Sequence, residues 1–219
     1  MTGIHADMVD IAMALKQLRS ILPLAAGQNQ LCAARRFTHL NILHFFLKQG
    51  RAPTHDDIPS ELEWIAALQQ LEAAGLIVLD SGSISIAYPF SAGDRGYHVT
   101  SVHGQVEAVC AFDALAISSM FRLPTRIDAT CRLSEKAITI QQDGKKLETD
   151  STVIAAIDWS AADNSQSCSA SLCTEMLFIG NQVLADKWQA EHPAQRQLFT
   201  LQEAHSFISE FFLPLVTPR

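Results

Sequence analysis

Residues 60–88 read SELEWIAALQQLEAAGLIVLDSGSISIAY, and their pattern changes from helical to alternating part-way along. Ser60 followed three residues later by Glu63 is a capping box, which predicts the start of a helix. The helix is expected to stop at Gly75, because glycine readily ends a helix. Two apolar segments then flank the turn sequence DSG at 80–82, which predicts a β-hairpin.

Two further helices are predicted upstream of this stretch. Residues 6–20 and residues 33–48 both carry apolar side chains at helical spacing, and residues 25–30, AAGQNQ, are expected to link them. Three helices and a hairpin in this order are typical of a winged helix, so residues 1–90 are predicted to form a winged-helix-like module. The inner face of the second helix is expected to carry these residues: Phe37, Leu40, Leu43, His44 and Leu47.

The charges of this module argue against DNA binding, the common use of the winged helix. Residues 1–90 carry six Lys and Arg against eight Asp and Glu, and the third helix contains three glutamates but no basic residue. A recognition helix needs basic groups for the phosphates. We therefore expect a structural or dimer-forming module that does not bind nucleic acid.

The second part of the chain, residues 91–219, mixes short strands with helices. Alternating segments predict strands near 97–102, 127–133, 137–141 and 153–159, with a hairpin turn at Asp143-Gly144. Residues 171–179 are apolar enough for a central strand, and helices are predicted at 184–192 and 201–215. The expected fold class is therefore α+β, a winged-helix-like helical module followed by a mixed β-sheet domain with flanking helices.

Composition restricts where the chain works and what it binds. The net charge of −7 argues against a general affinity for nucleic acid or anionic membranes. No apolar run approaches the roughly 18 residues of a membrane span, and no basic-then-apolar signal is seen. Five widely spaced cysteines without a Cys-x-x-Cys motif suit free thiols in a reducing compartment. We expect a cytoplasmic protein.

Cys110 and Asp113 form the most reactive combination in the chain. If a helix starts near residue 109, their three-residue spacing puts both side chains on one face. A thiolate binds a thiophilic metal, and a neighbouring carboxyl group can supply a proton, which suits cleavage of a carbon–metal bond. The alternative is a buried cysteine beside a capping or solvated aspartate.

The spacing of three cysteines and one tryptophan resembles that of the organomercurial (alkylmercury) lyase family. The pattern comprises Cys110-x-x-Asp113, Cys131 and Cys173, with Trp188 fifteen residues beyond the last cysteine. The similarity covers roughly residues 35–215 and is densest in these segments: 109–115, 129–131, 171–173 and 185–188. Val109 stands where family members usually have tryptophan, a departure that concerns substrate range and rate.

The resemblance implies protonolysis, in which an organomercurial gives a hydrocarbon and Hg(II) without a bound cofactor. Cys110 and Cys173 would occupy the two mercury-binding positions, Asp113 that of the proton donor, and Cys131 that of a structural cysteine. Two thiolates suit Hg(II) and make the carbon easier to protonate. The implied partners are the organomercurial substrate, low-molecular-weight thiols that remove Hg(II), and a mercuric reductase as one candidate acceptor, with no nucleic acid or membrane.

Other interpretations stay open at this point. The chain could be a non-catalytic thiol-based binder or carrier of Hg(II) or another soft metal, or a metal-responsive DNA-binding regulator. His98 or His103 could activate Cys110 in a cysteine hydrolase. Cys168 competes with Cys173 for the second mercury position, but Cys173 has the expected distances to Phe178 and Trp188.

Overall fold

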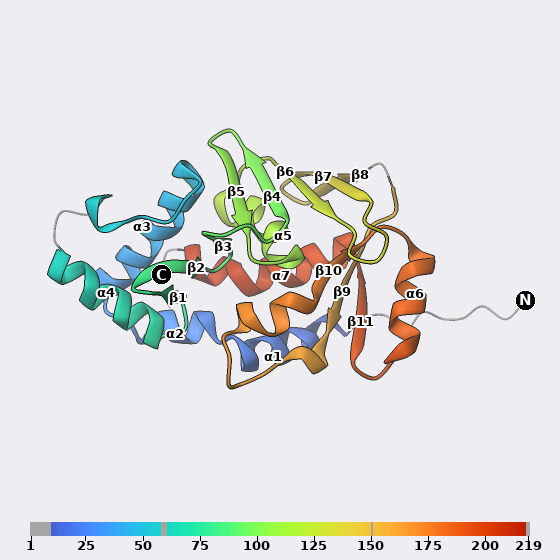
Figure 1. Ribbon diagram of the computed structural model, residues 1–219, viewed down its shortest axis with the longest axis horizontal. Helices are drawn as coiled ribbons and strands as arrows, with labels where there is room; N and C mark the ends of the chain where they lie inside the picture. Colours follow the sequence, from blue (N-terminus) through green and yellow to red (C-terminus); the bar gives the residue numbers. More distant parts are fainter. Residues whose placement is uncertain (1–9, 58–60, 150, 218–219) are drawn as a thin grey trace, which may run out of the picture.

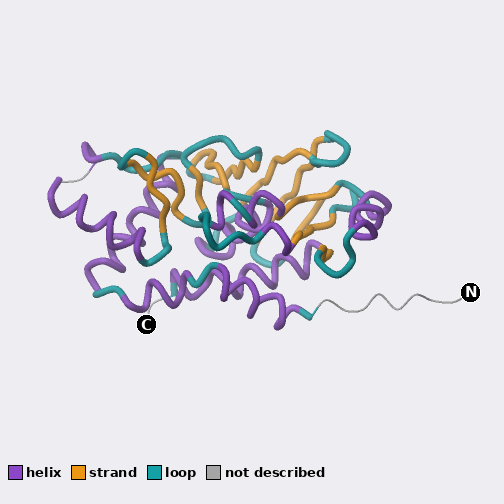
Figure 2. Tube along the Cα trace, turned by 60° about the horizontal axis from the view of Figure 1, so that its bottom comes forward, coloured by secondary structure: helices purple, strands orange, loops and turns teal. Residues whose placement is uncertain are grey.

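The computed structural model describes residues 10–57, 61–149 and 151–217, and confirms the α+β class (Figure 1). The strands predicted as one mixed sheet divide into two sheets, and each strand pair in the described part of the chain is antiparallel. Helices run below the strands and flank them at both ends of the molecule in Figure 2. None of the described helices is long and apolar enough to cross a membrane.

The N-terminal helices follow the predicted order, with one addition. Helices α1 (Ile11–Ile21), α3 (Ala33–Gln49) and α4 (Glu61–Ala73) are present, whereas the predicted cap at Ser60 and the start of the first helix lie outside the described residues. The linker expected at residues 25–30 is wrong, because Leu24–Gln30 form helix α2.

Helix α2 forms despite its glycine and polar residues because it packs closely on its neighbours. A Cβ atom at Gly27 would lie only 2.0 Å from the carbonyl oxygen of Ala74, so glycine permits this approach. The buried Gln28 amide donates to the Leu215 carbonyl at 3.0 Å and lies 3.0 Å from His39 Nδ1. Tertiary contacts therefore override the weak helical propensity of AAGQNQ.

The inner face predicted for α3 is partly wrong. Phe37 is 64% exposed and His44 is exposed, whereas His39 is fully buried. The helix is rotated relative to the prediction. The buried His39 has a polar partner at Nδ1, the Gln28 amide at 3.0 Å, whereas its Nε2 has no hydrogen-bond partner among the described residues. The residues buried on α3 are His39, Ile42, Leu43, Phe46 and Leu47.

The larger sheet has eight strands in the order β1-β2-β3-β5-β4-β6-β7-β8. The hairpin β1 (Ile77–Asp80) and β2 (Ser83–Ala87) is as predicted, and the short β3 (Phe90–Ser91) joins it to β5 (Gly104–Ala108). The sheet thus runs across the boundary expected near residue 90. The remaining strands are β4 (Tyr97–Ser101), β6 (Thr125–Thr130), β7 (Ala137–Asp143) and β8 (Lys146–Thr149).

The smaller sheet has the order β10-β9-β11. Its central strand is β9 (Ile154–Asp158), flanked by β10 (Met176–Ile179) and β11 (Arg196–Thr200). The central strand expected at residues 171–179 is wrong in extent and position: β10 starts at Met176 and lies at an edge. The polar Thr174 belongs instead to the 3₁₀ turn η4 (Leu172–Glu175), and Ser171 directly precedes this turn.

Two helices form the centre of the core. Helix α5 (Ala111–Phe121) is buried around most of its circumference, which explains its almost wholly apolar sequence, and helix α7 (Leu201–Val216) packs along it. Phe112 of α5 meets Phe199 and Phe207 at ring-centroid distances of 5.5 and 5.7 Å. Helix α6 (Gln182–Glu191) lies beside the small sheet (Figure 1).

Replacing Phe207 by alanine should lower the free energy of unfolding by about 3–5 kcal/mol, because it opens a cavity between α5 and α7. Urea unfolding followed by circular dichroism measures this change. Phe37→Ala is the matched control, since this side chain is 64% exposed and its loss should change stability by no more than about 0.5 kcal/mol. Equal losses in both variants would contradict the assigned core.

Candidate active site

The site begins at the N-terminus of α5. Cys110 is the residue that precedes this helix, in extended conformation, and Asp113 lies in the first helical turn. Their side chains meet as expected from the spacing, with Cys110 Sγ donating to Asp113 Oδ2 at 2.7 Å. Both are almost fully buried, with exposed fractions of 1% and 3%. A thiol and a carboxyl group thus share a proton-transfer contact away from bulk water.

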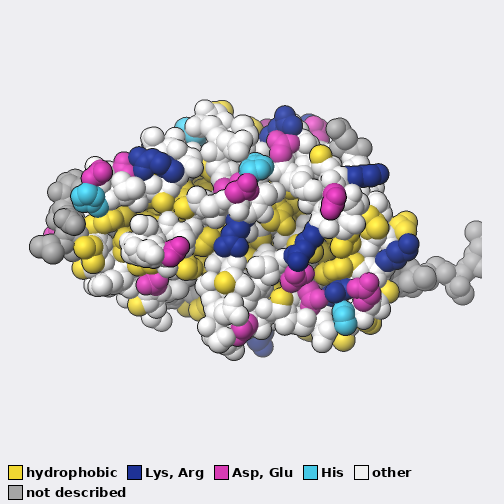
Figure 3. All heavy atoms as spheres, viewed as in Figure 1, with side chains coloured by type: hydrophobic (Ala, Val, Ile, Leu, Met, Phe, Trp, Pro, Cys, Tyr) yellow, Lys and Arg dark blue, Asp and Glu magenta, His cyan; other side chains and the backbone are white. Residues whose placement is uncertain are grey.

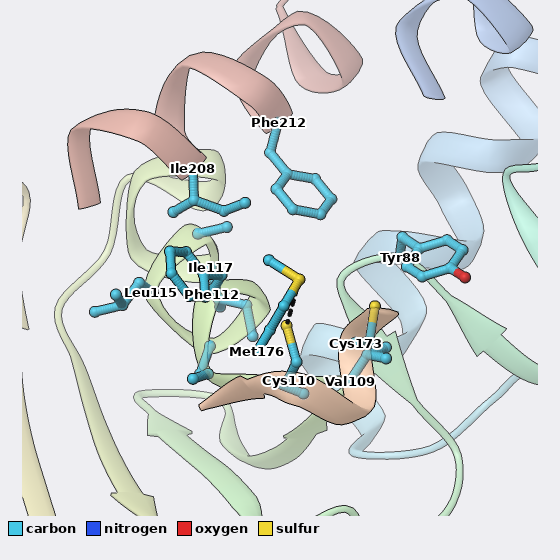
Figure 4. Packing of buried hydrophobic residues seen from close by; sticks show 14 of the residues in the cluster. Tyr88, Val109, Cys110, Phe112, Leu115, Ile117, Cys173, Met176, Ile208 and Phe212 are labelled. Carbon is cyan, nitrogen blue, oxygen red and sulfur yellow. Dashed lines mark hydrogen bonds between the residues drawn. The ribbon is translucent and has the colours of Figure 1, made fainter. Parts of the chain in front are cut away.

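Cys173 completes a group of three potential mercury ligands. It lies on the 3₁₀ turn η4, just before β10, and the ligand atoms of Cys110, Asp113 and Cys173 all lie within 4.8 Å of one another. Figure 4 shows Cys110 next to Met176, whose sulfur is 4.0 Å from Cys110 Sγ, and Cys173 on the side of Tyr88. Cys110 follows β5 of the large sheet and Cys173 precedes β10 of the small sheet, so the group lies where the two sheets meet.

The remaining cysteines occupy three different environments. Cys168 lies on η3 (Cys168–Ala170) with its sulfur 3.5 Å from Cys173 Sγ. Cys131 is outside the group of three: it follows β6 in a turn, is fully buried, and accepts a hydrogen bond from the Gly180 N–H at 3.3 Å. The strand predicted to run to residue 133 thus ends before Cys131. Cys32 is exposed at the start of α3.

Side chains from the loops that connect strands of the large sheet hold the segment that carries Cys168 and Cys173. The Tyr88 hydroxyl accepts from the Ser169 N–H at 2.9 Å, and Arg95 donates to the Ser169 carbonyl at 3.2 Å. Arg132 binds the other end of the segment through the Thr174 carbonyl and through Glu175 at 3.0 Å. These supporting residues were not found in the sequence, because isolated tyrosine and arginine residues far away along the chain give no local signal.

The site lies between an open cleft and a small internal cavity. The cleft, about 350 Å³, is lined by Cys173 and Cys131 together with Val109, Arg95 and Arg132. The internal cavity, about 10 Å³, is lined by Asp113, Cys173, Cys168 and Met176 and closed by apolar side chains of α1 and α7. Cys173 is the residue of the group of three that reaches both spaces, so it connects the entrance with the buried carboxyl group.

Burial keeps the two site thiols protonated at neutral pH. It raises the pKa of the Cys110 thiol to about 11. A hydrogen bond with Cys173 lowers this pKa, and the nearby Asp113 carboxyl group raises it further. Burial also raises the pKa of Asp113 to about 7, opposed by the Cys110 hydrogen bond and by the charge of Arg95. Hydrogen bonds with Cys110 and Cys168, together with burial, raise the pKa of Cys173 well above its usual range.

Comparison with known proteins gives the family. A family model described as alkylmercury lyase matches residues 90–213, more than half of the chain. The chain belongs to the alkylmercury lyase family. A crystal structure of the mercury-bound form of MerB2 has a similar fold, with a TM-score of 0.70 and 21% identity over 92% of this chain and 100% of that chain. No curated protein matches the chain.

Membership of the alkylmercury lyases makes this chain an enzyme of a family that acts on organomercurials. The likeness to MerB2 extends beyond residues 90–213 and therefore takes in the N-terminal helices as part of the shared fold. Trp188, one landmark of the family resemblance, lies on α6 with the Arg196 guanidinium 4.5 Å above its ring, outside the group of three.

The cysteine-hydrolase interpretation has little support in this geometry. His98 Nδ1 pairs with Glu107 Oε2 at 2.6 Å on the surface of the large sheet, and His103 is exposed in the β4–β5 turn. Within the described part of the chain, the side chains that contact the Cys110 sulfur belong to Asp113, Met176 and Cys173, and none of them is an imidazole. A carboxyl group, not a histidine, is thus the proton-exchanging neighbour of this thiol.

Asp113 should make stability depend on pH. Its pKa is about 7 in the folded protein and near 3.8 when unfolded, so the folded state holds the proton more tightly and the free energy of unfolding falls as pH rises from about 4 to 7. The Asp113→Asn variant lacks this titration. Urea unfolding should show the wild type losing up to about 4 kcal/mol relative to the variant across this window. A constant difference would mean that burial does not govern the carboxyl group.

Proposed function

We propose that the chain cleaves carbon–mercury bonds by protonolysis, with Cys110 and Cys173 as mercury-binding thiols and Asp113 as proton donor. The observation that carries the proposal is the buried group of three, whose ligand atoms lie within 4.8 Å of one another. Soft thiolates select a thiophilic metal, and a proton donor in the same group distinguishes cleavage from mere binding.

Substrate binding starts at Cys173, because this thiol lines the open cleft. The substrate R–Hg–SR′ exchanges its thiolate for Cys173, which releases R′SH and leaves R–Hg–S–Cys173. Thiol exchange of this kind needs no free thiolate at rest, since the proton leaves as the metal arrives. The raised pKa of Cys173 therefore keeps this thiol protonated in the empty site without preventing the reaction.

The second thiol charges the proton donor. As Cys110 binds mercury, its proton passes along the 2.7 Å hydrogen bond to ionised Asp113, so that mercury carries two thiolates and the carboxyl group is protonated. The extra thiolate pushes electron density onto the carbon. Asp113 then transfers the proton to this carbon, which gives RH, Hg(II) held by the two thiolates, and an Asp113 carboxylate. A pKa of about 7 suits a group that must both accept and donate.

The organic group is expected to lie on the side of the site where Asp113 and the internal cavity are found. Asp113 lines this cavity, and the carbon must approach its carboxyl group to be protonated. The opposite wall is apolar and consists of these residues: Leu18, Leu22, Ile208, Phe211 and Phe212. An alkyl group loses water contact there, and the dry surroundings keep the proton for the carbon.

Product release and the setting of the enzyme complete the proposal. Low-molecular-weight thiols entering by the cleft remove Hg(II), a mercuric reductase is a candidate acceptor, and no resident cofactor takes part.

We propose a cytoplasmic enzyme with residues 1–90 as a structural module and 91–219 as catalytic domain. Basic and acidic side chains are interspersed on the face in Figure 3, which supports the absence of a nucleic-acid partner.

The second candidate is a non-catalytic thiol-based binder of Hg(II) or another soft metal. The short distance of 3.5 Å between the Cys168 and Cys173 sulfurs favours it, because an extra thiol strengthens retention of the ion. Asp113 separates the two candidates, since binding alone needs no proton donor.

Replacing Asp113 by alanine should abolish hydrocarbon release while mercury binding is retained, because both thiols remain and the proton donor is lost. Gas chromatography of benzene from phenylmercury, in excess thiol, measures cleavage, and mass spectrometry of the mercury-loaded protein measures binding. We expect at least a 100-fold loss of rate, the lower end of general acid catalysis. Equal loss of binding and cleavage would argue against the assigned role.

Cys110→Ser and Cys173→Ser should each abolish hydrocarbon release, because a single thiolate neither holds the metal firmly nor activates the carbon. The same benzene assay applies. Cys32→Ser is the matched control, because this thiol is exposed at the start of α3 and should leave the rate unchanged. Full activity in either site variant would remove that cysteine from the mechanism.

A further inference from the structure

Cys168 is a buried thiol that the proposed cleavage does not use. Its sulfur lies 3.5 Å from Cys173 Sγ, and it is only 7% exposed. It lines the same internal cavity as Asp113 and Cys173. The Cys173 sulfur therefore has two thiol neighbours, Cys110 within 4.8 Å and Cys168 at 3.5 Å.

The surroundings of Cys168 hold its sulfur in this position. The next residue, Ser169, is bound on both sides of its peptide, since its N–H donates to Tyr88 and its carbonyl accepts from Arg95. The Ser171 hydroxyl donates to the Ser167 carbonyl at 2.9 Å and closes the turn around Cys168. These contacts hold the backbone that carries Cys168 beside Cys173 in the empty site.

We propose that Cys173 and Cys168 form a second mercury position, which takes the product Hg(II) from the Cys110–Cys173 position. This inference rests on the proposed function, because that reaction delivers Hg(II) to Cys173. In the transfer, the Hg–S bond to Cys110 breaks and one to Cys168 forms. The proton of Cys168 moves to the Cys110 thiolate, so charge and atoms balance and no redox step occurs.

The transfer returns the reactive pair to its resting state. Cys110 becomes a thiol again and can re-form its hydrogen bond to Asp113, which is the arrangement found in the empty site at 2.7 Å. Meanwhile Hg(II) stays attached to Cys173, which also lines the open cleft where external thiols arrive. Transfer to Cys168 thus moves Hg(II) away from the proton donor Asp113 while the ion stays bound to the protein.

The test is direct binding of HgCl₂ to Cys32→Ser/Cys110→Ser protein, which lacks the exposed thiol and the first mercury position. Equilibrium dialysis against a competing monothiol should show one Hg(II) per chain, held by Cys173 and Cys168. Adding Cys168→Ser should weaken binding by about 100-fold or more, because the second thiolate acts at high effective concentration. Adding Cys131→Ala is the matched control and should leave binding unchanged, since Gly180, not Cys173, contacts the Cys131 sulfur.

Undiminished Hg(II) binding after Cys168→Ser is added to the Cys32→Ser/Cys110→Ser protein would overturn the second mercury position. Loss of Hg(II) binding only when Cys131→Ala is added would overturn it as well. Benzene release from phenylmercury by the Cys32→Ser parent is measured in parallel. Failure of that release contradicts the proposed function, whereas the dialysis result decides the second mercury position independently of turnover. Far-ultraviolet circular dichroism of each variant establishes that any loss of binding is not a loss of fold.

Discussion

The hydrogen bond between Cys110 and Asp113 is the interaction on which the site depends. A carboxyl group with 3% exposure is costly in its charged form, and the raised pKa of about 7 expresses that cost. The packing of the core offsets this free-energy cost, because α5, which carries Asp113, is enclosed by α7 and by both sheets. In the proposed mechanism, the large hydrophobic core serves a chemical purpose: it maintains a dry space in which one proton moves between sulfur, oxygen and carbon.

The same burial explains why the thiols are protonated at rest. Elsewhere reactive cysteines are activated by neighbouring positive charge, which lowers the thiol pKa. Here the pKa values of both site thiols are raised, so the incoming metal itself must displace the protons. In the proposed mechanism, binding of the ion is thereby coupled to delivery of the proton, and a substrate without a thiophilic metal leaves both thiols protonated and the site inactive.

Local signals in the sequence predicted much of the fold. The hairpin turns at 80–82 and 143–144 and the periodic apolar residues of α1, α4 and α7 depend on neighbouring residues, so they could be recognised. The three-residue spacing also predicted the contact of Cys110 with Asp113. Helix α2, the buried face of α3 and the turn at Cys173 could not be predicted, because close packing at Gly27, a partner for His39 and contacts with distant arginines determine them.

The position of the site between two sheets links its geometry to its chemistry. Cys110 is fixed by the end of β5, whereas Cys173 belongs to a segment of turns bound to the large sheet through Tyr88, Arg95 and Arg132. A metal that joins the two thiols therefore bridges both sheets, and its binding energy stabilises their contact. The segment also carries Cys168. The same long-range hydrogen bonds therefore place both Cys168 and Cys173 relative to Cys110, which follows β5 of the large sheet.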